Sequence, residues 1–506
     1  MLSGAWLVSA SVTFDRTESV VGQQVLYARL RSGRHTEDLS AFEALVTHAG
    51  EDVPARERAQ LALSQLQAPA GYDLWWLAQP HALEAAPWHV LFPVAALSMV
   101  GFGVLAPFWP PAILLLVAGL LGSLVARGLI APSLRVVAGA FRQLNPLIAA
   151  AGALPASPTA AAPLVGRLHQ DAPRLSRLRR IASWAGRDPS AAVAGDLSGL
   201  LFEYLNMVLW LDGNALFFGA RELRARSSEL LRVIAAVGEI DAAVSVASYR
   251  AGTTAWTRPI LKPSGPVLLD DVRHPLLPDA VPASIALLPP NGVVITGSNM
   301  SGKSTFLRTV GVTTILAQTI NTCLARRYEA PLFVVRSCIE LADDPATGKS
   351  YYLVEVESVV ALLHAARGAV AHLMLFDELF RGTNAVERIA AAEAVLAGLV
   401  ATKGAEPARH VVIAATHDQE LVDLLRGLYA AHHFTDSIDS HGLTFDYKLH
   451  PGPATTRNAI ALLGQRGAPA EIISRALDRA QRLDTARRSV RSQGPMAETL
   501  SSLRQA

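Results

Sequence analysis

The chain has 506 residues, of which 51% are hydrophobic and 17% charged, and its formal net charge is +2. A chain of this length is too long to fold around a single hydrophobic core, so we expect about two to four domains. The near-zero charge excludes a strongly basic or acidic protein and leaves a nucleic-acid partner open. The high apolar content calls for a search for membrane segments.

The start of the chain and its two cysteines are both consistent with a protein that folds in the cytosol. No basic region precedes the short apolar run at the start, so we expect no cleaved signal peptide. Apolar spacing between residues 10 and 66 predicts helices. The two cysteines, Cys323 and Cys338, lack the spacing of a metal site, and we interpret them as buried thiols in a reducing compartment.

An almost uncharged stretch follows these helices, because Arg127 is the only Asp, Glu, Lys or Arg between Val90 and Ile130. Two spans fit this stretch, Val90–Pro107 and Pro111–Ile130, each close to the length that crosses a bilayer. The sequence PFWPP between them predicts a tight, helix-breaking link. The alternative is a buried hairpin in a large helical core, but soluble helices rarely lack a polar face for so long.

The arginines near this stretch predict its orientation. Arg127, Arg135 and Arg142 lie at the end of the second span or after it, whereas the link carries no charge. The positive-inside rule therefore predicts that both ends of the hairpin lie in the cytoplasm and the link lies outside. We expect the protein in the inner or cytoplasmic membrane, attached through residues 90–130.

Beyond the hairpin the composition changes twice. The Ala- and Pro-rich passage within residues 132–163 is typical of a linker. Residues from about 164 to 250 predict further helices, which include the basic segment RLHQDAPRLSRLRR. A solvated helix face is the simpler interpretation of that segment, against a role in binding lipid headgroups or nucleic acid.

From about residue 264 short β-branched runs alternate with predicted helices. The runs are GVVIT, LFVVRS, HLMLFDE and HVVIAATH. This alternation predicts an α/β domain with a largely parallel sheet.

The run GVVIT continues directly into ITGSNMSGKST, which contains the pattern G-x-x-x-x-G-K-[ST]. A strand, such a loop and a following helix bind polyphosphates, because backbone N–H groups and the helix N-terminus face the negative charge. Lys303 is expected on the outer phosphates, and the Ser304 hydroxyl on Mg²⁺. The residues expected to bind ATP are Gly297, Ser298, Asn299, Met300, Ser301, Gly302, Lys303, Ser304 and Thr305.

Two further runs end in candidate catalytic residues. The apolar run Leu373–Phe376 ends in Asp377 and Glu378. Asp377 can join the Mg²⁺ ligands, and Glu378 can orient or deprotonate the attacking water. The run VVIAATHD predicts another strand, after which His417 can contact the γ-phosphate.

Together these segments resemble one family. TGSNMSGKSTFLR, SYYLVEVESVVALLHAA, LMLFDELFRGTNAVE and AATHDQELVDLL are similar to the ATPase domain of MutS-type DNA mismatch repair proteins, and the likeness begins at DDVRHPLL. YKLHPGPATTRNAIALLGQRGAPAEIISRAL resembles the family's C-terminal helical dimerisation region. LFEYLNMVLWLD and AAVGEIDAAVSVASYRA resemble the end of its helical core domain, and FDRTESVVGQQVLYARLRS resembles the start. No L-S-G-G-Q sequence is present, which argues against an ordinary ABC transporter ATPase.

The resemblance implies that Ser350 contacts the nucleotide of a partner subunit, so that a homodimer is the active unit. It leaves DNA binding open. The sequence also departs from the family. We find no mismatch-reading domain ahead of the core-like segment, and the Phe-x-Glu wedge of mismatch readers occurs only at Phe376, inside a predicted strand. The apolar hairpin stands where family members carry long levers and a DNA clamp.

The expected fold is an α/β P-loop NTPase domain of the ABC/MutS type, preceded by an all-α MutS core-like domain that a transmembrane helical hairpin interrupts. The expected domains are the first part of the core-like domain (1–88), the hairpin (89–131), the linker (132–163), the second part of the core-like domain (164–260), the ATPase domain (261–450) and a C-terminal helical dimerisation segment with its tail (451–506).

We expect a membrane-anchored, MutS-like ATPase that hydrolyses ATP with Mg²⁺ in a homodimer and binds DNA without dedicated mismatch reading, its ATPase domain facing the cytoplasm. One alternative is a membrane-associated ATPase or scaffold with no nucleic-acid role, although two spans per chain make a poor transport path. The other is a true DNA mismatch repair protein, which the missing wedge disfavours.

Overall fold

The chain divides into two compact units. A helical unit extends to Arg258 and also takes in Ile315–Cys323, and an α/β unit comprises Pro259–Thr314 and the chain from Leu324 onward. The computed structural model describes residues 13–32, 39–79, 82–83, 86–154, 163–185, 197–287, 292–298, 300–339, 350–400, 410–439, 442–454 and 459–493.

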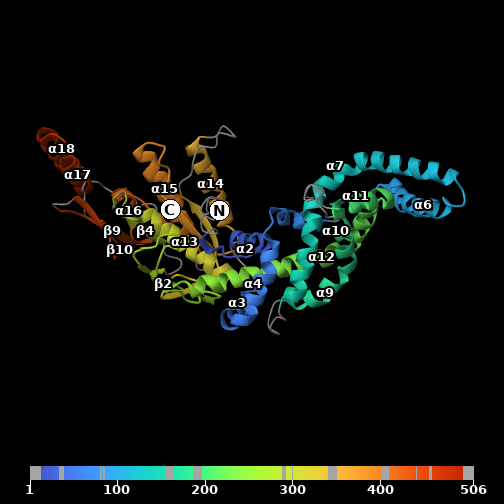
Figure 1. Ribbon diagram of the computed structural model, residues 1–506. Helices are drawn as coiled ribbons and strands as arrows, with labels where there is room; N and C mark the ends of the chain where they lie inside the picture. Colours follow the sequence, from blue (N-terminus) through green and yellow to red (C-terminus); the bar gives the residue numbers. More distant parts are fainter. Residues whose placement is uncertain are drawn as a thin grey trace. The chain divides into compact units, whose positions relative to one another are not determined.

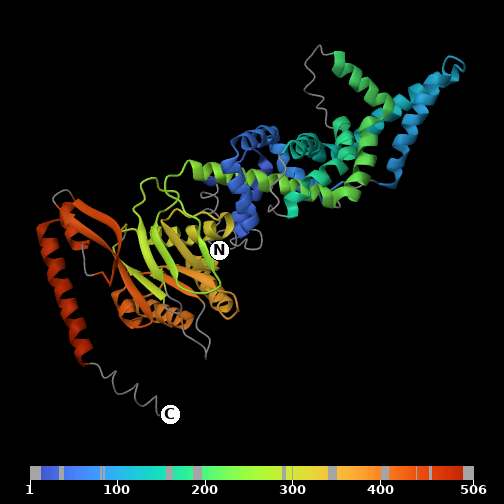
Figure 2. The same cartoon turned by 90° about the horizontal axis from the view of Figure 1, so that it is seen from below.

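The long helix α12 (Leu211–Ala251) is the centre of the helical unit (Figures 1 and 2). Its second half is buried over most of its residues. The helices α2 (Val20–Ser32) and α3 (Leu39–Glu51) pack against it. The other short elements of this unit are α4 (Val53–Leu63), η1 (Ser64–Leu66), η2 (Pro69–Asp73), α5 (Leu74–Leu77), α8 (Pro163–Gly166), α9 (Leu168–Arg174), α10 (Ser176–Ala185) and α11 (Leu197–Leu209).

Buried polar contacts join the start of the chain to α12. The carboxylate of Asp241 accepts hydrogen bonds from the backbone N–H groups of Glu18 (3.0 Å) and Ser19 (2.8 Å). Burial raises the pKa of Asp241 to about 6, although these hydrogen bonds oppose the shift. Arg29 and Glu239 form a buried ion pair. The segments before and after the apolar hairpin therefore form one core.

The apolar stretch forms a helical hairpin (Figure 1). It comprises η3 (Pro87–Val90), α6 (Leu91–Leu105) and the first part of α7 (Pro111–Ala153). Among the described residues, one helix, Pro87–Leu105, is long and apolar enough to cross a membrane, and Pro111–Ala126 is a shorter apolar helix.

The linker expected within residues 132–163 is wrong over its first part, because α7 continues to Ala153. Pro132 and Pro146 both lie inside this helix. Proline normally interrupts a helix, but side chains of the last four turns pack against α9, α10 and α12 and outweigh that tendency. They are Phe141, Leu144, Leu147, Ile148 and Ala151. Residues 155–162 of the expected linker lie outside the described part of the chain.

The main sheet of the α/β unit has six strands in the order β10-β9-β4-β8-β7-β6. All neighbouring pairs are parallel except β9 and β10. The carboxyl ends of the parallel strands therefore meet at one edge. The strands are β4 (Gly292–Thr296), β6 (Val334–Cys338), β7 (His372–Asp377), β8 (Val411–Ala415), β9 (Tyr429–Asp439) and β10 (Gly442–Pro451).

A second sheet, which the sequence does not predict, has four strands in the order β1-β5-β2-β3. Its strands are β1 (Ile260–Lys262), β2 (Val267–Val272), β3 (Ala283–Leu287) and β5 (Arg327–Pro331). The helices that begin in this unit are α13 (Lys303–Ile320), α14 (Tyr351–Ala365), α15 (Ala385–Val400), α16 (Gln419–Leu424), α17 (Ala459–Gln465) and α18 (Ala470–Gln493). This architecture confirms a helical region followed by an α/β domain, with mixed rather than purely parallel sheets.

Candidate functional site

The loop between β4 and α13 contains two glycines in backbone conformations that residues with a side chain rarely adopt. Gly297 and Gly302 both have positive φ angles, 141° and 111°. A Cβ at Gly297 would lie 2.8 Å from Ser301 Oγ, so the loop closes on itself where a larger residue does not fit. This curvature turns the loop around the N-terminus of α13, which begins at Lys303.

Polar groups gather inside this loop. Lys303 Nζ donates hydrogen bonds to the carbonyl oxygens of Gly297 and Ser298, both at 2.8 Å. Burial lowers the pKa of Lys303, although Glu378 and Asp377 oppose the shift. The buried hydroxyls of Ser298 and Ser301 have no hydrogen-bond partner among the described residues. Buried groups of this kind normally find a partner, so the loop fits an anionic group such as a phosphate.

The remaining residues of the expected loop differ in their surroundings. Met300 has a φ of 71° and is exposed, and Thr305 lines the adjacent cavity. Asn299 lies outside the described residues.

Ser304 and Asp377 come together from different elements. Ser304 lies in the first turn of α13, and Asp377 is the last residue of β7. Burial raises the pKa of Asp377, and a hydrogen bond from the Ser304 side chain opposes that rise. A hydroxyl and a carboxylate side by side are the oxygen ligands that Mg²⁺ prefers. These two residues therefore fit a magnesium ion.

Glu378 and His417 also meet at this edge of the sheet. Glu378 follows β7, His417 lies just after β8, and Glu378 Oε1 is 3.2 Å from His417 Nδ1. This hydrogen bond lowers the pKa of Glu378 and raises that of His417. His417 is 49% exposed, whereas Glu378 is mostly covered. The carboxylate is thus kept ionised, as a general base requires.

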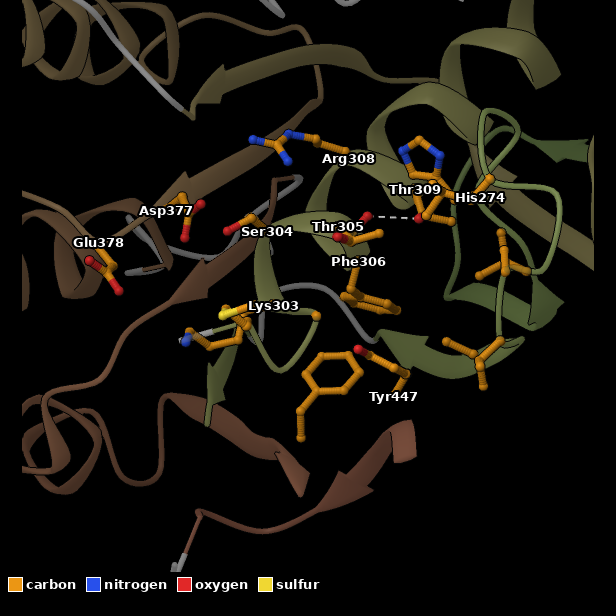
Figure 3. A pocket seen from close by; sticks show the side chains of 18 of the residues that line it. His274, Lys303, Ser304, Thr305, Phe306, Arg308, Thr309, Asp377, Glu378 and Tyr447 are labelled. Atoms are coloured by element: carbon orange, nitrogen blue, oxygen red, sulfur yellow. Dashed lines mark hydrogen bonds between the residues drawn. The ribbon is translucent and has the colours of Figure 1, made fainter. Parts of the chain in front are cut away.

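Lys303, Ser304, Asp377 and Glu378 line one cavity of about 1160 Å³, and His417 is not among the described residues that line it. Figure 3 shows Lys303, Asp377 and Glu378 on one side of it, and Phe306 and Tyr447 on another. A polar end and an aromatic wall suit a ligand that combines phosphates with a flat ring. Sequence reasoning missed this wall: Tyr447, which has a φ of 53°, lies on β10, and only the antiparallel pairing with β9 brings it here.

The last of the expected site residues, Ser350, lies at the start of α14. It is the N-cap of α14, where its hydroxyl accepts a hydrogen bond from the N–H of Leu353 at 3.5 Å. It is exposed, and it is not among the described residues that line the cavity of its own chain. Its expected contact with a partner's nucleotide therefore stays a prediction.

The arrangement supports one kind of chemistry. A cationic side chain and a loop of N–H groups can hold a polyphosphate, an oxygen pair can hold a divalent cation, and a carboxylate can activate water next to both.

Comparison with known proteins agrees with this geometry. Residues 293–484 match the family model described as MutS domain V. The chain is 32% identical over 274 residues to the DNA mismatch repair protein MutS of Natronomonas pharaonis, a match that covers 51% of this chain and 30% of the relative. The MutS of Streptococcus pyogenes serotype M5 is 32% identical over 294 residues, with 55% and 33% covered. The MutS of Streptococcus equi subsp. equi is 31% identical over 289 residues, with 54% and 32% covered.

The chain spans about a third of the length of the curated relatives it matches, and the likeness covers its C-terminal half. Domain V is the ATPase-type domain of the MutS proteins, and the family resemblance inferred from the sequence is confirmed there. Through its C-terminal half, which carries domain V, this chain belongs to the MutS family.

Proposed function

We propose that this protein hydrolyses ATP with Mg²⁺ at the cavity that lies beside the loop 297–302 and the end of β7. The observation that carries the proposal is the convergence of Lys303, Ser304, Asp377 and Glu378 on one cavity from separate elements. The match to MutS domain V supports the same activity.

Each residue has a distinct role in this proposal. Lys303 and the loop N–H groups bind the phosphates, and Ser304 and Asp377 hold the Mg²⁺ ion, which neutralises phosphate charge when bound. Glu378 accepts the proton of the attacking water or orients that water. His417 holds Glu378 through its 3.2 Å contact and keeps it ionised.

Replacing Lys303 with alanine is expected to weaken ATP binding itself. The side chain supplies the positive charge nearest the loop, and its loss leaves the loop carbonyls of Gly297 and Ser298 without their donor. We expect the dissociation constant for ATP to rise at least about tenfold, the effect of losing about 1.4 kcal/mol. A fluorescent ATP analogue titrated into the detergent-purified protein measures it. Unchanged affinity would contradict the assignment of Lys303.

We further propose that the active unit is a homodimer in which Ser350 completes the site of the partner subunit. Ser350 is exposed at the start of α14, and it is not among the described residues that line the cavity of its own chain. Its side chain is therefore accessible to a partner subunit. ATPase activity should therefore rise faster than linearly with protein concentration in dilute solution.

A mixture of two inactive variants tests the shared site. A mixed dimer of Ser350→Ala and Lys303→Ala chains contains one intact site, because the unchanged Lys303 and the unchanged Ser350 come from different chains. Activity should therefore recover partly on mixing, with a maximum near equal amounts. Absence of recovery at every ratio would contradict a shared site.

The proposed function also includes DNA binding. The relatives are named DNA mismatch repair proteins, and we infer that the dimer binds DNA without dedicated mismatch reading. The experiment is ATP hydrolysis with matched duplex, mismatched duplex and branched DNA. Equal stimulation by matched and mismatched duplex supports the proposal. A selective response to the mismatch would favour true mismatch repair, and no response to any DNA would favour the scaffold alternative.

We also propose that the hairpin attaches the protein to the inner or cytoplasmic membrane, with the ATPase domain in the cytoplasm. Its apolar side chains face outward: Phe108 is 85% exposed, Leu97 74% and Leu114 73%. Soluble monomers rarely expose a continuous apolar surface of this kind. With a rise of 1.5 Å per residue, the helix Pro87–Leu105 is about 28 Å long, close to the thickness of a hydrocarbon core.

A further inference from the structure

The turn that carries Glu378, residues 378–382, has an unusual backbone. Glu378 has a φ of 53° and Phe380 a φ of 58°, both in the left-handed region that residues with a side chain seldom adopt. Such a conformation persists only where surrounding contacts hold it. The Glu378 turn therefore needs a partner that fixes it.

The backbone N–H of Glu378 donates a hydrogen bond to the carbonyl oxygen of Ala415 at 3.0 Å. The partner that holds the middle of the turn is Glu355 on α14. Glu355 Oε1 accepts a hydrogen bond from the backbone N–H of Phe380 at 2.7 Å. Glu355 is only 2% exposed, and its second oxygen has no hydrogen-bond partner among the described residues. Burial raises the pKa of Glu355, and the Phe380 N–H opposes that shift. Burying a carboxylate costs free energy unless hydrogen bonds offset the cost. Here the hydrogen bond from the Phe380 N–H supplies that compensation.

The same helix touches the turn at a second point. A Cβ at Gly382 would lie 3.3 Å from the Cβ of Tyr352, so α14 lies directly against the turn. Leu379 and Phe380 are buried in the core that α14 and α15 share. These contacts hold the turn at Phe380 and at Gly382, and Glu378 lines the cavity.

We propose that Glu355 is a positioning residue for ATP hydrolysis: by holding the Phe380 N–H it sets the direction of the Glu378 carboxylate. The inference rests on the proposed function and deepens it. Glu355 lies about 7.5 Å along the helix axis from Ser350, the N-cap of the same helix.

Three variants of the full-length protein in detergent test the proposal. Glu355→Met keeps the length of the side chain but removes the acceptor, and Glu355→Gln keeps a carbonyl oxygen that can accept. Glu357→Met is the matched control, because Glu357 is an exposed carboxylate on the same helix. We expect Glu355→Met to lower kcat by about 10-fold to 10²-fold, the usual effect of misplacing a reacting group. The ATP dissociation constant should stay unchanged, and Glu355→Gln and Glu357→Met should keep kcat near that of the wild type.

The same substitution in a Glu378→Gln background separates positioning from general loss of structure. If Glu355 acts through Glu378, Glu355→Met should slow the Glu378→Gln protein no further. A wild-type kcat in Glu355→Met, a parallel fall in ATP affinity, or an undiminished effect in the Glu378→Gln background would overturn the inference. Should Glu355→Met not fold, Glu355→Asp decides: its shorter side chain withdraws the acceptor, and it should also slow hydrolysis at unchanged affinity.

The two proposals fail in different ways. If Glu378→Gln hydrolyses ATP at the wild-type rate, the proposed function of Glu378 is wrong. If Glu378→Gln is slow while Glu355→Met is normal, only the positioning role of Glu355 is wrong.

Discussion

Replacement of Glu378 by glutamine is expected to slow ATP hydrolysis by about 10²-fold or more, the range observed when a general base is lost. Glutamine keeps the size of the side chain and a possible contact with His417, but it cannot accept the proton of the attacking water. Lys303, Ser304 and Asp377 are unchanged, so ATP binding should be preserved. Single-turnover hydrolysis and a binding titration on the same preparation measure both quantities.

The matched control is Glu420→Gln, which neutralises an exposed carboxylate in the first turn of α16. This variant should hydrolyse ATP at the wild-type rate. Normal hydrolysis by Glu378→Gln would show that another group activates water. Loss of binding and hydrolysis together would show that Glu378 holds the site rather than acts in the reaction.

Removal of the hairpin is expected to release the protein from the membrane while the fold survives. Both ends of the hairpin lie against Trp210: the Phe92 ring is 5.9 Å from the Trp210 ring, and a Cβ at Gly122 would lie 3.6 Å from it. A short glycine-serine link can therefore replace residues 94–121. The full-length protein should stay in the pellet after an alkaline carbonate wash, and the shortened one should be soluble and bind ATP.

Two outcomes would contradict the anchor. A full-length protein that alkaline carbonate releases is not held in the hydrocarbon core. A shortened protein that no longer folds would show that the hairpin belongs to a soluble core. The exposed apolar residues of α6 and α7 argue for a membrane anchor, since a helix in a soluble core would bury them.

Labelling tests the orientation of the same hairpin. A cysteine at Phe108 should react with a membrane-impermeant thiol reagent added outside intact cells, because the positive-inside rule places the link there. The native thiols of Cys323 and Cys338 are buried, so the background should be low. Labelling only after the cells are opened would contradict the expected orientation.

The sequence predicted the strands of the site better than their surroundings. The runs that became β4, β7 and β8 are short and apolar, and each is fully or almost fully buried. Those of β4 and β8 are also rich in β-branched residues. The sequence also predicted that Asp377 binds the Mg²⁺ ion and that His417 contacts the γ-phosphate, which requires both to lie near the loop 297–302. Their roles stay predictions.

The features that the sequence missed depend on contacts between distant segments. The four-stranded sheet pairs β1 with β5, which are far apart along the chain, and no local pattern shows such a pairing. The continuation of α7 through Pro132 and Pro146 depends on packing. The contact between Glu378 and His417 depends on the positive φ of Glu378, which the fold imposes and the residue itself disfavours.

The decisive measurement for the proposed ATPase is steady-state ATP hydrolysis by the full-length protein in detergent, at a protein concentration high enough for dimers. We expect turnover that requires Mg²⁺, that EDTA abolishes and that Lys303→Ala lacks. Turnover that is equal in the wild type and in Lys303→Ala, or no Mg²⁺-dependent turnover in the wild type with or without DNA, would contradict it.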